Sequence, residues 1–399
     1  MKSISLHPNP IFERKGWESL NGEWDFGFSK KAVKNYRFLS EQAALELCRQ
    51  SVFEHKINVP FCVESELSGI GYTDFLNSVW YKRTVNISPN GNRVFLHIGA
   101  ADYKTTVILN AKIVGSHKGG FTPMCFDITE YAVDGENELF ILCEDNTRDS
   151  LIAGGKQSDR KKSYACSYTR TTGIWQSVYI EYVPFDYVEN FRLTPSLKHK
   201  NITLELDLCG KGKLEINAYL DEKNVVSSCI EEASGFVIVQ LPISEVKAWE
   251  PGNATIYDLE INFGDDKVRS YFGLRDIALE DYKFMLNGKS VFQRTVLDQG
   301  FYRRGIYTAE NDEELKRDIT LSMALGFNAA RLHQKVFDPR FLYFCDLMGY
   351  MVWGEYASWG IDYSNPKAVD IFLSEWREAL GRDYNHPAII GWCPFNETW

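Results

Sequence analysis

Two patterns of apolar and polar residues succeed one another along the chain, a β pattern and then an alternation of strands and helices. From about residue 15 to 182, short apolar or alternating runs are separated by turn sequences such as Pro89-Asn90-Gly91 and Asp134-Gly135. This pattern is typical of a sandwich of two β-sheets. We therefore predict a first β-sandwich domain over residues 1–183, interrupted by one weak helix at 41–48. Its strands include 94–98, 106–109 and 139–142.

The same β rhythm continues beyond Pro184, over a stretch of the size of a small immunoglobulin-like sandwich. We predict such a domain over residues 184–278. Its strands are expected at 202–208, 213–220, 235–241 and 253–263.

Near Lys283 the rhythm changes to alternating strands and helices. Each helix has an N-terminal signal: Asn311 is followed three residues later by Glu314, and Asp338-Pro339 and Asn365-Pro366 each join a cap to a proline. Strands are expected at 291–298, 327–331, 350–355 and 388–397, and the third helix shows an apolar face at Val369, Phe372, Leu373, Trp376 and Leu380. This order predicts the first half of a (β/α)8 TIM barrel over residues 279–399. The fold class is thus multidomain, β followed by α/β.

Composition narrows the class of protein. The 399 residues exceed what one core usually organises, and 44% apolar with 25% charged residues is ordinary for a globular protein. The net charge of −10 is spread along the chain, which argues against a nucleic-acid partner. Nine cysteines without CxxC spacing fit free thiols in a reducing compartment and indicate no zinc site. Because no apolar leader or membrane-spanning run is seen, we expect a cytoplasmic protein without a membrane partner.

The end of the last predicted strand carries the strongest chemical candidate. The apolar run 388–392 leads into Asn396 and Glu397. A carboxyl group buried at such a strand end would have a raised pKa, which suits a general acid near neutral pH. Asn396 would then offer its amide to a sugar hydroxyl beside the reacting carbon.

Other polar residues stand at the remaining strand ends, and in such barrels these ends form the active site. Arg331 and His333 would bind hydroxyls or hold carboxylates, while Asp298 and Glu355 would complete the mouth of the barrel. A plain Arg331–Glu355 ion pair is an equally open interpretation of these two residues. We expect the aromatic rings of Trp353, Trp359 and Trp392 to form a floor against which a pyranose stacks.

With these residues placed, the chain resembles glycoside hydrolase family 2, which contains β-galactosidases, β-glucuronidases and β-mannosidases. The resemblance covers nearly the whole chain. It rests on Ser19-Leu20-Asn21-Gly22-Glu23-Trp24, Val79-Trp80-Tyr81-Lys82-Arg83, Gly173-Ile174-Trp175-Gln176, Leu286-Asn287-Gly288-Lys289, Asn328 to His333, and Asp383 through Trp392 to Asn396-Glu397. The chain departs from the family's usual residues at Leu332, Gln334-Lys335 and Cys393.

This resemblance implies that the first domain is a jelly-roll sugar-binding domain. It also implies a retaining exo-β-glycosidase acting on terminal non-reducing sugars, most simply β-galactosidase-like, with Glu397 as acid/base and Asn396 as the contact to the 2-hydroxyl. The family's nucleophile would lie beyond Trp399, so we expect an N-terminal portion that is inactive alone. Some relatives bind Mg²⁺ or Na⁺ and many form oligomers, but no residue here specifies a cofactor.

Two other classes of protein remain open on sequence grounds. The β-sandwiches could form a non-catalytic carbohydrate-binding or assembly module. An adhesion protein without sugar chemistry is disfavoured, because it would not explain the polar residues at four strand ends.

Overall fold

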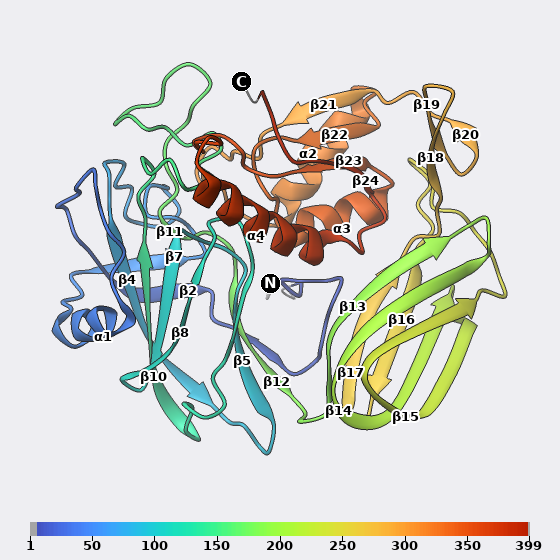
Figure 1. The fold of residues 1–399 in the computed structure, drawn as a ribbon, viewed down its shortest axis with the longest axis horizontal. Coiled ribbons are helices and arrows are strands. Elements are labelled where there is room, and N and C mark those ends of the chain that lie inside the picture. Colours follow the sequence, from blue (N-terminus) through green and yellow to red (C-terminus); the bar gives the residue numbers. More distant parts are fainter. Residues whose placement is uncertain (1–5, 398–399) are drawn as a thin grey trace.

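The structure is a computed structural model that describes residues 6–397, and it contains three packed parts. Figure 1 shows a β-sandwich in blue to green, a second sandwich in light green to yellow, and an α/β unit in orange to red that packs beside both. The N-terminal segment lies in the centre of this view, where the three parts meet.

The first sandwich consists of a four-stranded sheet, β1-β12-β5-β9, and a six-stranded sheet, β3-β2-β4-β10-β7-β8. Alternating residues of both sheets, such as Val94, Leu96 and Ile98, fill the core between them. The strands are β1 Trp17–Ser19, β2 Gly22–Phe28, β3 His55–Val59, β4 Ser78–Ile87, β5 Arg93–Ile98, β6 Ala101–Asp102, β7 Lys104–Leu109, β8 Lys112–Lys118, β9 Met124–Asp127, β10 Gly135–Glu144, β11 Gly173–Ile174 and β12 Val178–Val183.

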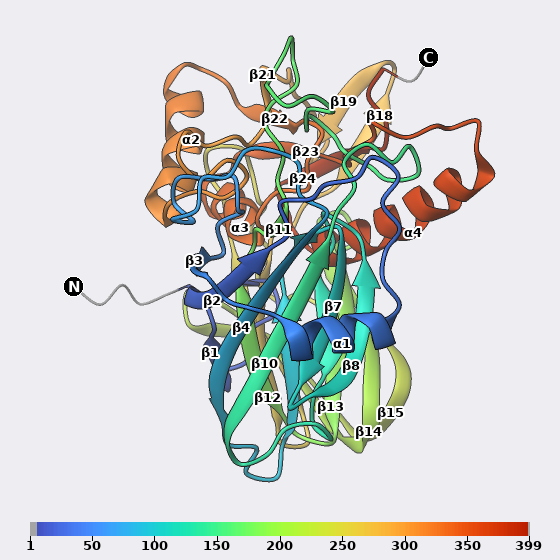
Figure 2. The same cartoon turned by 90° about the vertical axis from the view of Figure 1, so that its left-hand side faces the viewer.

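The expected helix is present as α1, Glu41–Gln50, and its N-cap Ser40 accepts a hydrogen bond from the Ala43 amide. It lies across the outer face of the six-stranded sheet (Figure 2). There Ala44 and Leu45 pack against Ile108 and its neighbours. Strand β7 is therefore buried along its whole length, and β10 is buried from Leu139 to Glu144.

The second sandwich is built around two strands of 20 residues each, β14 and β15. The segments 202–208 and 213–220, expected as separate strands, belong to one strand whose register shifts between Leu208 and Lys211. Gly210 has φ +93° at this bulge, so a glycine bends the continuous strand here. The strands are β13 Tyr187–Ser196, β14 Asn201–Leu220, β15 Lys223–Pro242, β16 Tyr257–Phe263 and β17 Asp266–Phe272.

A small antiparallel hairpin sheet leads into the α/β unit, whose four parallel strands lie in the order β21-β22-β23-β24. The three predicted N-caps, Asn311, Asp338 and Asn365, each accept a backbone hydrogen bond as expected. The elements are β18 Ile277–Glu280, β19 Lys283–Leu286, β20 Lys289–Ser290, β21 Thr295–Asp298, α2 Asp312–Ala324, β22 Ala329–Leu332, α3 Pro339–Met348, β23 Met351–Glu355, α4 Pro366–Asp383 and β24 Ile389–Cys393.

Helix α4 packs through a narrower face than the sequence predicted. Phe372 and Trp376, four residues apart, are buried, whereas Leu373 is 41% exposed. The next position on the buried face is Ala379, which is 1% exposed. The prediction for Leu373 is wrong because a residue adjacent to Phe372 is rotated about 100° around the helix axis.

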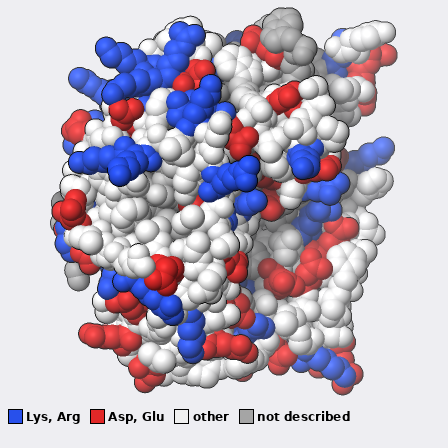
Figure 3. Space-filling model, turned by 60° about the vertical axis from the view of Figure 1, so that its left-hand side comes forward, with Lys and Arg blue, Asp and Glu red and all other residues white. Residues whose placement is uncertain are grey.

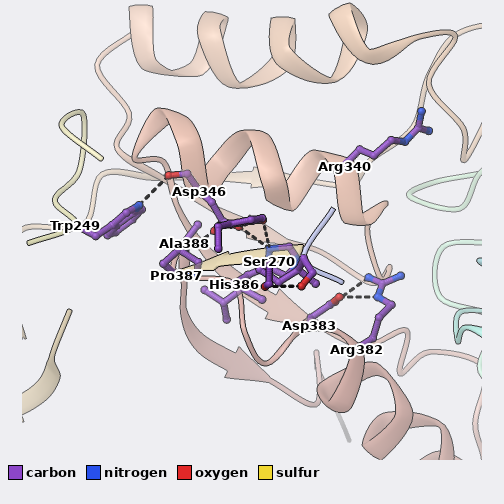
Figure 4. Close-up of polar contacts among 12 residues, drawn as sticks. Trp249, Ser270, Arg340, Asp346, Arg382, Asp383, His386, Pro387 and Ala388 are labelled. Carbon is purple, nitrogen blue, oxygen red and sulfur yellow. Dashed lines mark hydrogen bonds and ion pairs between the residues drawn. The ribbon is translucent and has the colours of Figure 1, made fainter. Parts of the chain in front are cut away.

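A buried polar cluster joins the second sandwich to the α/β unit (Figure 4). Asp346 of α3 lies 2.5 Å from His386 Nδ1 and accepts hydrogen bonds from the Tyr271 hydroxyl at 2.8 Å and the Ala388 amide at 2.7 Å. Its backbone carbonyl accepts from the indole of Trp249. His386, buried beside Asp346, thus orders the turn before β24 from within the core.

Arg14 makes a second buried junction, between the N-terminal segment and both sandwiches. Its guanidinium pairs with both oxygens of Asp266 in β17, at 2.8 and 3.0 Å, and with Glu181 in β12 at 3.0 Å. A further N–H donates to the Val188 carbonyl at 2.6 Å. Arg14, Glu181 and Asp266 are all buried, so each charge depends on the others for compensation.

The surface is mixed in charge. On the face drawn in Figure 3, basic and acidic side chains are interspersed. Among the described residues, no helix is long and apolar enough to cross a bilayer.

Candidate active site

The centre of the candidate site is an ion pair between two neighbouring parallel strands. Arg331 of β22 donates from Nε to Oε2 of Glu355, at the end of β23, at 2.5 Å. The same guanidinium donates from Nη2 to Oδ1 of Asn396 at 3.0 Å. Three of the predicted site residues are therefore held in one hydrogen-bonded group at the carboxyl ends of the strands.

The second oxygen of Glu355 is occupied as well. Oε1 accepts from the backbone amide of Gln334 at 3.0 Å and lies 3.1 Å from Nδ1 of His333. Burial raises the pKa of Glu355, but the contacts with His333, Arg331 and the Gln334 amide outweigh it and leave the pKa below its usual range. Glu355 is thus an ionised anchor for its neighbours, with both oxygens engaged.

Gln334 is a site residue that sequence reasoning missed. It is buried with φ +56°, and its Oε1 accepts from the amides of Ser358 and Trp359, both at 3.0 Å. Its Nε2 donates to Ser358 Oγ at 2.8 Å, and this hydroxyl accepts from the Asn396 amide at 3.1 Å. The Trp359 indole donates to the Asn396 carbonyl at 2.9 Å. Gln334 therefore positions the segment that carries Asn396 and Glu397.

The sequence offered one signal for this role, namely the departure from the family's usual residues at Gln334-Lys335. It could not show the contacts, because Ser358 lies 24 residues further along the chain. A buried amide with several partners is recognised only once those partners are in place.

Replacing Gln334 by Ala is expected to lower the free energy of unfolding by about 1–3 kcal/mol, because buried amides of the 358–359 turn lose their acceptor. The urea midpoint measures this loss. The matched control is Gln50→Ala, which removes an exposed amide that donates a hydrogen bond to Glu46. Equal effects of the two substitutions would contradict the positioning role of Gln334.

Glu397 lies differently from the expectation. Strand β24 ends at Cys393, so Glu397 follows it in an irregular segment with φ +48°. Its side chain is exposed and makes no hydrogen bond or ion pair with any described residue. The burial on which its assignment as an acid was argued is absent from this structure, although its neighbour Asn396 belongs to the cluster.

Asp298 does not join the cluster. In the pairing of β21 with β22, Leu297 lies opposite Arg331 and Asp298 lies opposite Leu332. Side chains alternate between the faces of a strand, so Asp298 points away from Arg331. It accepts from the Gly300 amide at 2.8 Å, and burial raises its pKa. The predicted place of Asp298 at the mouth is therefore wrong, and it caps the turn that follows β21.

Trp392 also points away from the mouth of the barrel, because side chains alternate between the two faces of a strand. It lies over Gly354 and meets the ring of Trp376 of α4 edge-on, with centroids 5.7 Å apart. It therefore packs between the sheet and α4 and does not form a floor for a sugar. Trp353 lies over Gly391 on the opposite face and donates to Gln293 at 2.8 Å.

The first sandwich reaches the mouth through the loop between β10 and β11, drawn in green near the C-terminus in Figure 1. The amides of Gly154 and Gly155 donate to the Trp359 carbonyl at 2.8 and 3.2 Å. Lys156 places its Nζ 3.7 Å from the centre of the Trp359 indole. This cation–π contact fixes the indole at the rim of the candidate site.

No group of three or more His, Cys, Asp or Glu residues within residues 6–397 could hold a metal ion. The Mg²⁺ or Na⁺ implied by the resemblance is therefore assigned no ligands here.

Comparison with known families accounts for all three parts of the chain. Residues 17–184 match the sugar binding domain of glycosyl hydrolases family 2, residues 186–275 match a model described simply as glycosyl hydrolases family 2, and residues 277–399 match the family's TIM barrel domain. The chain belongs to glycosyl hydrolases family 2.

Curated relatives include both β-glucuronidases and β-galactosidases. A putative β-glucuronidase of Formosa agariphila is 24% identical over 100% of this chain and 48% of its own length. A β-galactosidase of Thermoanaerobacterium thermosulfurigenes is 26% identical over 78% of this chain and 46% of its own. The chain thus spans about half the length of these relatives.

Solved structures agree on the fold. The β-glucuronidase of Bifidobacterium dentium in complex with coumarin-3-O-glucuronide superposes with a TM-score of 0.80 at 21% identity, covering 97% of this chain and 69% of that one. The β-glucuronidase of Ruminococcus gnavus superposes with a TM-score of 0.80 at 20% identity, covering 97% of this chain and 68% of that one. Two β-sandwiches followed by part of an α/β barrel are therefore the architecture of this chain.

Proposed function

We propose that this chain carries the acid/base half of a retaining exo-β-glycosidase site, with Glu397 as the acid/base. The observation that supports this most directly is the orientation of Asn396. Because Arg331 holds its Oδ1, its Nδ2 remains to donate, and no described residue accepts from it. An amide donor fixed beside Glu397 suits a sugar hydroxyl adjacent to the reacting carbon.

In this proposal Glu397 first protonates the leaving oxygen and then removes a proton from the attacking water. A retaining reaction also needs a carboxylate nucleophile about 5 Å away across the sugar. Glu355 does not fit that role, since both of its oxygens are occupied and its side chain is buried. We therefore assign the nucleophile to none of the described strand ends.

The charge at the mouth favours a neutral sugar. The Arg331 guanidinium is already compensated by Glu355, so it offers little excess charge to a uronate. We accordingly propose β-galactosides as the first substrate class, with β-glucuronides as the alternative that the relatives' names support equally.

The test is hydrolysis of p-nitrophenyl β-galactoside and β-glucuronide by this chain and by a version that includes any coding sequence downstream of Trp399. We expect turnover of the galactoside by the longer version alone. Turnover of the glucuronide instead would overturn the choice of sugar. Binding of sugars without hydrolysis by either version would favour a non-catalytic carbohydrate-binding module.

A further inference from the structure

A sheet face away from the candidate active site brings an exposed thiol, an imidazole and a carboxylate together. It is the outer face of the four-stranded sheet of the first sandwich, on the side where β5 and β12 lie next to the second sandwich (Figure 1). A cavity of about 490 Å³ lies over this face, within the range of small-molecule sites. Cys125, His97 and Glu181 line this cavity, whereas Arg331 and Glu355 do not.

The alternation of side chains along the strands places the thiol and the imidazole on the same face. Met124 and Phe126, the neighbours of Cys125 in β9, are buried in the core of the sandwich, so Cys125 points outward and is exposed. His97 lies directly opposite Cys125 in the pairing of β5 with β9, a position that brings two Cβ atoms to about 4.5–5.5 Å from each other. The imidazole and the thiol share a hydrogen bond across the two strands.

The imidazole of His97 is held in place from its other side. Tyr179 of β12 lies opposite His97 and stacks on it, with ring centroids 4.6 Å apart and planes at 8°. Nε2 of His97 lies 3.3 Å from Oε2 of the buried Glu181. His97 therefore stands between a thiol and a carboxylate, which is the arrangement of an activated nucleophile whose neighbour is oriented by a third group.

The charge of His97 completes the arrangement. Burial lowers the pKa of His97, but the charge and the hydrogen bond of Cys125 and the contact with Glu181 outweigh burial and raise the pKa to about 10. His97 is therefore protonated at neutral pH and presents a positive charge to the sulfur of Cys125. A neighbouring imidazolium favours the thiolate, which is the nucleophilic form of cysteine.

We propose that Cys125 is a modification site that forms a mixed disulfide with low-molecular-weight disulfides. The Cys125 sulfur attacks one sulfur of the reagent, so that an S–S bond to Cys125 forms while the S–S bond of the reagent breaks. The second half of the reagent leaves as a thiolate and takes up the proton that Cys125 has lost. Cys125 is oxidised and the released half is reduced, so the disulfide is the only oxidant that the step needs. The attached group then lies in the cavity where the three parts of the chain meet.

Two other exposed cysteines, Cys166 and Cys229, serve as controls within the same molecule. Cys229 lies opposite Glu215 in the pairing of β14 with β15 and donates to Glu231 at 3.4 Å. Partial desolvation and the Glu231 carboxylate raise the pKa of the Cys229 thiol. Because all three thiols are exposed, a difference in their rates reports the surroundings of each sulfur.

The test measures the rate at which each cysteine of the full chain reacts with bis(2-hydroxyethyl) disulfide at pH 7, followed by acid quenching and peptide mass spectrometry. This reagent is neutral, so charges near the thiols do not attract or repel it. We expect Cys125 to react about tenfold or more faster than Cys166 and Cys229. His97→Gln, which replaces the cation by a neutral amide, should remove most of this difference. His199→Gln, at an exposed position of the second sandwich, is the matched control and should leave it unchanged.

Two outcomes would overturn the proposal: equal rates at the three exposed cysteines of the unsubstituted chain, or a fast reaction of Cys125 that His97→Gln leaves intact. Unfolding of the His97→Gln variant would be recognised by reaction of the buried thiols Cys62, Cys143 and Cys345. The comparison within the unsubstituted chain then decides. None of the residues of the proposed hydrolytic function takes part and no hydrolysis is measured, so the result is separate from success or failure of the glycosidase proposal.

Discussion

Replacing Glu397 by Gln is expected to reduce kcat for glycosides with poor leaving groups by about 10²- to 10⁴-fold, the usual contribution of a general acid. The amide has the shape of the carboxyl group but carries no proton for the leaving oxygen. The measurement is made on the form of the protein that hydrolyses an aryl β-glycoside, across alkyl and aryl glycosides of graded leaving-group pKa.

The dependence on leaving group separates acid catalysis from damage to the fold. A p-nitrophenolate leaves without much help from a proton, so its glycoside should lose far less in the first step than an alkyl glycoside does. Glu280→Gln, at an exposed position of β18, is the matched control. An unchanged rate, or an equal loss for all leaving groups, would contradict the assignment of Glu397.

Replacing Arg14 by Met is expected to lower the free energy of unfolding by about 3–5 kcal/mol, because Glu181 and Asp266 would remain buried without their shared cation. The control is Arg192→Met, whose side chain is 56% exposed and pairs with Glu205 at 3.5 Å. The loss in the control should stay below about 1 kcal/mol. The urea midpoints of the two variants, monitored by tryptophan fluorescence, measure these two losses of stability. Equal midpoints would contradict the role of Arg14 as a buried junction.

The same substitution should change the response to acid. Burial raises the pKa of Glu181, but His97 and Arg14 outweigh it and lower the pKa to about 2. Since this value lies below the unfolded pKa of about 4.3, the stabilisation from Glu181 is present above pH 4.3 and is lost as the pH falls toward 2. In Arg14→Met the pKa of Glu181 in the folded state should rise, so the part of the stability that is lost in acid should shrink. If the substitution only removed packing, this acid-dependent loss of stability would stay unchanged.

Much of the α/β unit could be predicted because its signals are local. The caps Asn311, Asp338 and Asn365 bond to amides two or three residues away, and the structure confirms all three. The site residues were predicted less well. Asp298 and Trp392 were placed at the mouth from their positions along the chain, yet each points to the other face of the sheet, since a shift of one residue exchanges the faces of a strand.

Sequence patterns were sufficient to predict the order of sandwich, sandwich and α/β unit, the starts of the helices, and the convergence of Arg331, Glu355 and Asn396. These depend on periodicity, on caps, and on the rule that parallel strands end at one edge. Other features are visible only in the folded chain: Gln334 bridges to Ser358, Arg14 meets Asp266 across 252 residues, and a cavity lies between the three parts. The physical reason is that a buried polar group is stabilised by partners distant in sequence, and no local pattern encodes which groups folding brings together.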